Sequence, residues 1–366
     1  MSVPSRTFTT WVGFDVPFQL PNIDEVTITL DIDAVAWQTV NLTGGPLVNP
    51  SDADAIDPRI NGGIGMLVQV RAQDLQGNEL RSFPGTYQYA ANQTQPEFYM
   101  VRSTNVDWVT GKVTVEAASG ELQHLDTRYV GTTVYDTGAT TLFELARYGV
   151  GHSDAVPLTD RLSAASVPIS AGDRRLIQPG ESYWDFMVNE LSAAGGRVFE
   201  SGAGYHVIAD REDPPRDTTI TTLALSTSPD LDGVLVESVT ETRSIDTDWA
   251  DAVIVRYDYT NGAGNKVTTY QTAGQADGTL QTRALSLSRD RAASGANLAT
   301  SILGRAQRRG QAFETVCAID FAVRPGVDLT LARPSGTVDL GKCRSVEYRI
   351  HEGRMTVRSQ IGEPIG

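Results

Sequence analysis

The pattern of apolar and polar residues along this chain is dominated by strands of β-sheet. In the segment EVTITLDIDAVAW, Val26, Ile28 and Leu30 alternate with polar neighbours, which is typical of a strand with one face in the core and one in water. The sequence therefore predicts a mainly β protein. Four further runs have strand length and many β-branched residues: GMLVQVRAQD, KVTVEAA, GVLVESVTETR and DAVIVRYDY.

Two turn signals join neighbouring strands. Asn261-Gly262 lies between DAVIVRYDYT and KVTTYQT, and Glu352-Gly353 lies between SVEYRIH and RMTVRSQ. Short connections that contain glycine favour antiparallel hairpins. We therefore predict one hairpin at each of these two places.

Three segments have the apolar spacing of a helix instead. In one of them, Trp184, Met187 and Leu191 form a single stripe, and a glycine pair ends the helix before a predicted hairpin. We expect the stripe to pack on the apolar face of that hairpin, which consists of Val198, Tyr205 and Val207. The three helices are predicted at 140–149, about 182–194 and 295–310.

The helix at 295–310 ends in an arginine cluster. Arg305, Arg308 and Arg309 lie in its last turn, where positive charge suits the helix dipole. The same arginines could instead meet acidic residues of a neighbouring chain. The pattern leaves both interpretations open.

The distribution of these elements predicts three domains. A first β domain covers 1–125, a helix-and-hairpin α/β domain covers 126–225, and a second β domain with a flanking helix covers 226–366. The stretch REDPPRDTT at 211–219 is the expected linker, because paired prolines and charges continue neither a helix nor a strand.

Composition excludes several classes of protein. The 366 residues carry a formal net charge of −15, whereas a protein that holds nucleic acid needs a basic surface. We therefore expect no sequence-specific binding of nucleic acid. No apolar run reaches the roughly 18 residues that span a bilayer, so no membrane span is expected.

Motifs of known chemistry are also missing from the sequence. There is no G-x-S-x-G elbow and no phosphate-binding G-x-x-x-x-G-K-[ST], and the four histidines form no local metal motif and are expected at surface or turn positions. The acidic run at 52–57 lacks the rest of a calcium loop and is expected to be a solvated loop. Cys317 is expected to face inward, and a Cys317–Cys343 bridge requires that their strands pair. We predict no catalytic, cofactor-binding or metal-binding residue.

Three stretches in a fixed order carry a family resemblance. They are PGESYWDFMVNELSAAGGRVFESGAGYHVIADRE, then VESVTETRSIDTDWADAVIVRYDY, and a closing GVDLTLARPSG followed by GKCRSVEYRIHEGRMTVRSQ. Preceded by a β domain, this order resembles baseplate hub proteins of tailed bacteriophages, also called tail hub or minor tail proteins. The resemblance covers roughly residues 20–360 and is most specific over 179–360.

The resemblance implies a fold class, which is mainly β with α+β: two tail-tube-like β-barrel domains joined by a helix-containing α/β domain. It also implies a homotrimer. Three chains with two tube-like domains each would form a ring that adapts the sixfold tail tube to the threefold tip and lets DNA pass. In that ring, the stripe of Trp184, Met187 and Leu191 would be scaffold, and the arginine cluster would be an interface candidate.

The implied partners are other tail proteins. A tail tube or distal tail protein would contact one side of the ring and a tip or spike protein the other, with the tape measure protein as a further partner. The implied location is the virion tail tip, after assembly in the host cytoplasm. Some relatives carry a C-terminal enzymatic domain, but this chain is expected to have no room for one after its last hairpin, so no enzyme activity is predicted.

A second class of function competes with the hub. A carbohydrate-binding or carbohydrate-cleaving β protein of a tail tip would use exposed tryptophans as sugar platforms and a carboxylate pair for acid and base catalysis. Trp108 and Trp249 stand at strand entrances, where we expect them to cap the core instead. The other tryptophans that would serve this function are Trp11 and Trp37.

Overall fold

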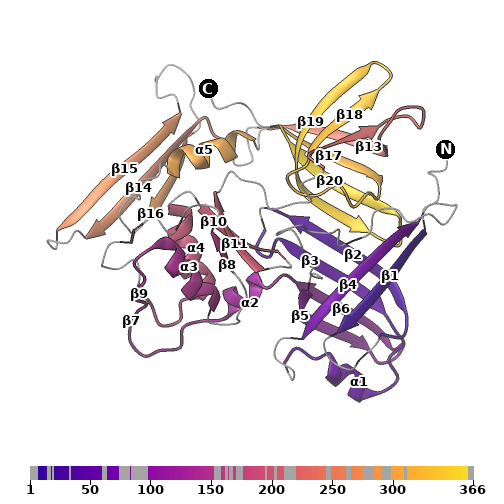
Figure 1. Cartoon of the computed structure of the whole chain (residues 1–366), viewed down its shortest axis with the longest axis horizontal. Helices are drawn as coiled ribbons and strands as arrows, with labels where there is room; N and C mark the ends of the chain where they lie inside the picture. The colour runs from indigo at the N-terminus through magenta and orange to yellow at the C-terminus, as the bar shows by residue number, and fades with distance from the viewer. Residues whose placement is uncertain are drawn as a thin grey trace.

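The fold is described from a computed structural model of the whole chain (Figure 1). Strands dominate it, which confirms the predicted mainly β class. The structure describes residues 7–14, 18, 20–32, 34–59, 64–73, 83, 98–151, 158–160, 164, 168–169, 176–193, 196–201, 204–209, 220–244, 249–260, 265–274, 284–289, 298–308 and 311–361.

The N-terminal part of the chain forms a six-stranded antiparallel sheet in the order β1-β4-β5-β6-β3-β2. The predicted alternation is visible in β2, where Val26, Ile28 and Leu30 are buried and their neighbours are more exposed. We call this sheet the first β unit. Its strands are β1 (Thr7–Phe14), β2 (Ile23–Asp31), β3 (Gln38–Gly44), β4 (Gly65–Gln73), β5 (Phe98–Asp107) and β6 (Lys112–Ala118).

The C-terminal part forms a closed six-stranded barrel. Its strands follow one another as β18-β12-β13-β17-β20, and β19 closes the circle because it pairs with both β18 and β20. The antiparallel pair β19–β20 is the hairpin predicted at Glu352-Gly353. The strands are β12 (Thr222–Ser226), β13 (Val234–Arg243), β17 (Gln311–Ala318), β18 (Asp328–Arg333), β19 (Gly336–Arg349) and β20 (Arg354–Gln360).

An α/β unit lies beside the first β unit (Figure 1). Its sheet β10-β11-β8 is covered by α3 and α4, two of the three predicted helices. The elements are α2 (Glu121–Asp126), β7 (Tyr135–Asp136), α3 (Leu142–Gly151), β8 (Leu158–Asp160), β9 (Leu176–Ile177), α4 (Tyr183–Ala193), β10 (Gly196–Ser201) and β11 (Gly204–Ala209).

The core of the α/β unit has the packing that the helical spacing predicts. The side chains of the α4 stripe are buried, and they share one cluster with apolar residues of the β10–β11 hairpin and of α3. The hydroxyl of Ser182 accepts a hydrogen bond from the Asp185 amide at the start of the helix, 2.9 Å away. The six predicted members of this cluster are Trp184, Met187, Leu191, Val198, Tyr205 and Val207.

A third sheet lies on the far side of the α/β unit from the first β unit (Figure 1). It is ordered β15-β14-β16, and its hairpin β14–β15 was predicted from the sequence. Helix α5 packs on β14 and β15, so this sheet and helix form a small core of their own. The elements are β14 (Ala252–Thr260), β15 (Lys266–Gly274), β16 (Ala284–Arg289) and α5 (Leu298–Arg308).

One local prediction differs from the structure, and another falls on residues that the structure does not describe. The acidic run expected to be a loop contains a short helix, α1 (Pro50–Ala55), whose first turn begins at a proline, a residue well suited to that position. The expected linker at 211–219 lies outside the described residues.

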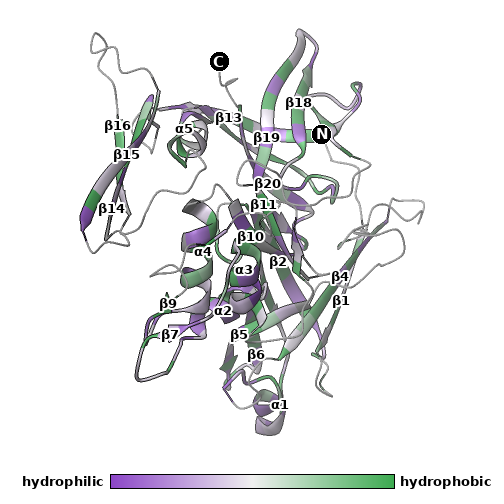
Figure 2. Ribbon diagram, turned by 60° about the vertical axis from the view of Figure 1, so that its left-hand side comes forward, coloured by the Kyte–Doolittle hydropathy of each residue, from purple (hydrophilic) through white to green (hydrophobic). Residues whose placement is uncertain are grey.

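One hydrophobic core extends through the first β unit and the barrel. Hydrophobic residues follow the strands of both, with hydrophilic residues interspersed (Figure 2). Cys317 and Cys343 are buried in this core and are not bridged. Their strands β17 and β19 do not pair with each other, because β20 lies between them.

We predict that Trp184→Ala destabilises the protein by about 3–5 kcal/mol, because truncation of a buried aromatic side chain leaves a cavity in a packed core. The indole is only 5% exposed. Urea denaturation followed by fluorescence or circular dichroism measures the change. The control is Val130→Ala in the same unit, where the side chain is 92% exposed and a change within about 0.5 kcal/mol is expected. An unfolding midpoint of Trp184→Ala equal to that of the wild type would contradict the described packing.

Candidate functional site: the joints of the fold and its exposed surfaces

One pair of strands joins the first β unit to the barrel. β2 and β19 pair antiparallel over Thr27–Asp31 and Ser345–Arg349. The Ile350 amide continues the pairing, with a 3.0 Å hydrogen bond to the Val26 carbonyl. The two six-stranded units are therefore connected edge to edge in one continuous sheet.

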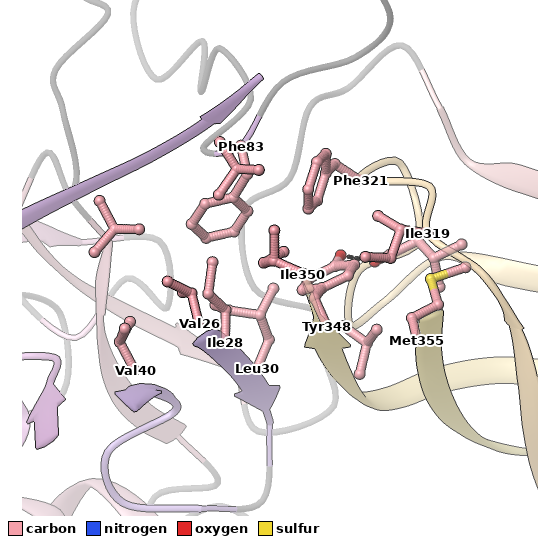
Figure 3. Close-up of a cluster of buried hydrophobic side chains, with 14 of the residues drawn as sticks. Val26, Ile28, Leu30, Val40, Phe83, Ile319, Phe321, Tyr348, Ile350 and Met355 are labelled. Atoms are coloured by element: carbon pink, nitrogen blue, oxygen red, sulfur yellow. Dashed lines mark hydrogen bonds between the residues drawn. The ribbon is translucent and has the colours of Figure 1, made fainter. Parts of the chain in front are cut away.

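An aromatic cluster fills the space beneath this joint. Phe83, which bridges to β4, lies 5.7 Å from Phe321 and 6.0 Å from Tyr348 between ring centroids. Phe321 and Tyr348 are 5.1 Å apart, and Figure 3 shows them together with Phe83 and with the apolar residues of β2. The Arg324 guanidinium lies over the Phe83 ring at 5.2 Å, a cation–π contact. Side chains from both units thus share one desolvated cluster.

A cleft of about 520 Å³ opens next to the joint. One wall is β1 and the other is the start of β2 together with the turn between β19 and β20. Because β1 and β2 are the two ends of the first sheet, the cleft marks the place where that sheet does not close. Its lining residues are Thr7, Phe8, Thr10, Trp11, Val12, Leu20, Pro21, Asn22, Ile23, Ile350 and His351.

A second joint, made of polar groups, connects the first β unit to the α/β unit. The Glu121 carboxylate accepts hydrogen bonds from the Glu200 amide at 2.7 Å, from the Ser119 hydroxyl and from the Trp37 amide. The Trp37 indole donates to the Glu200 carbonyl, and the Glu200 carboxylate accepts the Gly120 amide. A Cβ at Gly120 would lie 2.7 Å from the Tyr205 hydroxyl and 2.9 Å from that carboxylate, so the close approach favours glycine.

The Glu121 side chain is removed from water at this joint, with 2% of the residue exposed. Burial raises the pKa of its carboxyl from 4.5 to about 7, although the hydrogen bonds from the Glu200 amide and the Ser119 hydroxyl act in the opposite direction. His124 is also buried here, 2.8 Å from the Tyr205 hydroxyl. The expectation that every histidine lies at the surface is therefore wrong, because the Tyr205 hydroxyl satisfies the polar edge of the imidazole.

Of the structural and interface candidates proposed from the sequence, those that the structure describes lie away from these two joints. Trp184, Met187 and Leu191 are buried within the α/β unit. Arg305 and Arg308 lie on α5, and their side chains, like Arg309, fall outside the described part of the chain. The role of the arginine cluster as an interface stays a prediction.

The tryptophans considered as sugar platforms differ in exposure. Trp37 is buried in the polar joint, whereas Trp11 is 50% and Trp108 56% exposed. The expectation that Trp108 caps the core is wrong, because it lies at the tip of the β5–β6 turn. In that turn, the Asp107 carboxylate accepts the Val109 amide and the Thr110 hydroxyl at 2.9 and 2.7 Å.

The described residues contain no group of three His, Cys, Asp or Glu side chains that could hold a metal ion. Burial raises the pKa of the Cys317 thiol to about 12, which keeps it protonated and a poor nucleophile at neutral pH. Among the helices that the structure describes, none is both long and apolar enough to cross a bilayer.

Comparison with known proteins identifies the fold. A tail protein from Neisseria meningitidis is similar with a TM-score of 0.61 and 12% sequence identity, over 96% of this chain and 96% of that one. A 43 kDa prophage tail protein from Shewanella oneidensis has a TM-score of 0.57 and 10% identity, over 96% and 98%. A prophage tail protein from Listeria monocytogenes has a TM-score of 0.51 and 9% identity, over 93% and 90%.

The likeness to these tail proteins extends over nearly the whole chain and is not confined to one of its units. No family model and no curated protein sequence matches the chain. The resemblance of the sequence to phage tail proteins is confirmed as a likeness of fold.

We predict a pH dependence of stability that originates at Glu121. Between about pH 4.5 and 7 the folded chain keeps a proton on Glu121 that the unfolded chain has released, so this contribution is complete below pH 4.5 and is lost as the pH rises to about 7. The loss is on the order of 3 kcal/mol. Denaturation of wild type and Glu121→Gln at a series of pH values tests it, because the variant cannot ionise and should lack this fall in stability.

The matched control is Glu116→Gln, which changes an exposed glutamate of the first β unit. It should follow the wild-type pH curve. Equal pH slopes for wild type and Glu121→Gln between pH 4.5 and 7 would show that the Glu121 carboxyl has no raised pKa.

Proposed function

We propose that this chain is a structural component of a phage tail, and that three copies form a ring at the tail tip or baseplate. The observation that carries the proposal is the presence of two six-stranded β units in one chain, joined edge to edge through β2 and β19. Three chains would supply six such units. A ring of this kind matches a sixfold tail tube on one side and a threefold tip on the other.

The fold comparisons support this proposal, because likeness over nearly the whole chain to three tail proteins, two of them from prophages, favours an assembly role. Closed rotational symmetry is the usual solution for copies of one chain. The proposed partners are a tail tube or distal tail protein, a tip or spike protein, and the tape measure protein. The proposed location is the tail tip of the virion, reached after assembly in the host cytoplasm.

The net charge of −15 fits a passage for DNA. Acidic surfaces repel phosphate groups, so a channel lined by such a protein does not retain the DNA that moves through it. The proposed ring would guide the genome and leave it free to pass.

The first prediction from this proposal concerns copy number. Cryo-electron microscopy of intact tails should show three copies of the chain around the tail axis at the end of the tube. One copy, six copies, or a position on a peripheral fibre would refute the ring. Because the tail raises the effective concentration of neighbouring copies, the purified chain is expected to assemble less readily in dilute solution.

The second prediction concerns enzyme activity. We expect the purified chain to release no soluble product from peptidoglycan or host glycan, since a glycosidase needs two carboxyl groups across a substrate cleft and the described lining residues of the cleft beside β1 include no Asp or Glu. Release of reducing sugars that disappears on substitution of a single carboxylate would contradict a purely structural function.

A further inference from the structure

The free edge of β1 is the starting point for a more specific inference. Within the described residues, β1 pairs with β4 on one side and with no strand on the other. In an antiparallel pair, alternate residues direct their N–H and C=O groups away from the partner, so about half of the eight residues of β1 present unpaired backbone groups.

The sequence of β1 does not protect this edge. Natural edge strands carry charged residues, proline or bulges that prevent pairing with another chain. The strand TFTTWVGF has no charge and no proline, and its register with β4 runs without a shift from Thr7 to Phe14. An edge of this length and composition is suited to receive a further strand.

The cleft of about 520 Å³ lies along the same edge. Its described lining residues combine apolar side chains, such as Phe8 and Leu20, with the hydroxyl of Thr10, and they include no Asp, Glu, Lys or Arg. A charged segment would lose its hydration there without gaining a partner. The chemistry of the lining therefore selects an uncharged occupant.

The size of the cleft limits the occupant to a single strand. A rise of about 3.3 Å, a strand spacing of about 4.8 Å and a layer thickness of about 10 Å give about 160 Å³ per strand residue. The cleft thus holds about three residues of an extended segment. The described edge strands of a second copy are β1, β7, β8, β9, β10, β15 and β16, and each carries a neighbouring strand on its other side. That neighbour would need room for a second strand, which a cleft of this volume does not offer.

We propose that β1 binds one extended, uncharged segment of a different tail polypeptide, which adds to its free edge and fills the cleft. Backbone hydrogen bonds to β1 would provide affinity, and one or two apolar side chains beside Phe8 and Leu20 would provide specificity. The inference rests on the proposed function, which brings other tail proteins next to this chain.

Hydrogen exchange tests the strand addition. The amides of β1 that face away from β4 should exchange at least about tenfold more slowly in assembled tails than in the purified chain. Thr10→Trp, which places a bulky indole in the cleft beside β1, should abolish this slowing, whereas the matched control Thr9→Trp, at an exposed position outside the cleft, should retain it. Equal protection of β1 in the purified wild-type chain and in tails would overturn the proposal, whatever the stability of the variants.

Photo-crosslinking identifies the source of the segment. With benzoylphenylalanine at position 9, which lies on β1 outside the cleft and leaves it open, tails should yield a cross-link to an uncharged extended segment of another tail protein. A cross-link to a second copy of this chain, or none, would overturn the proposal. If microscopy shows three copies per tail but the β1 amides are not protected, strand addition is refuted and the ring stands. If the β1 amides are protected but the copy number is not three, the ring is refuted and strand addition stands.

Discussion

The structure depends on β19 taking part in two sheets. This 14-residue strand closes the barrel between β18 and β20, and it also pairs with β2 of the first β unit. Side chains of Phe83 from the first β unit and of Phe321 and Tyr348 from the barrel then pack together beneath the joint. Tyr348 belongs both to the paired stretch and to the aromatic cluster, so the hydrogen bonds and the packing meet at one place and the two β units share a single core.

The α/β unit is attached by a different kind of interaction. Its joint consists mainly of hydrogen bonds around Glu121 and Glu200, next to the buried pair of His124 and Tyr205, and Ile208 of β11 is its one member of the core of the β units among the described residues. Buried polar networks contribute specificity of geometry, since each group is costly to leave without its partner. The polar joint fixes the orientation of the α/β unit, whereas the apolar joint holds the two β units together.

The two β units differ in whether their sheets close. The barrel has paired edges throughout its circle, whereas the first β unit stops short of closure between β1 and β2, where the turn after Ile350 occupies part of the gap. An assembly of such chains would therefore present one closed and one open unit per copy. Neighbouring chains can extend the sheet of the open unit by a strand, whereas they can only pack against the surface of the closed barrel.

The sequence alone determined the local elements. The alternation of apolar and polar residues predicts β2, and the helical spacing of Trp184 and Leu191 predicts α4, because each depends only on the period of its own element. The likeness to tail proteins followed from the order of such elements along the chain. Tertiary structure decided the joints. No periodicity places Glu121 against Glu200 or Phe83 against Tyr348, because these contacts join residues that are far apart in the chain, and only the folded sheets bring them within reach.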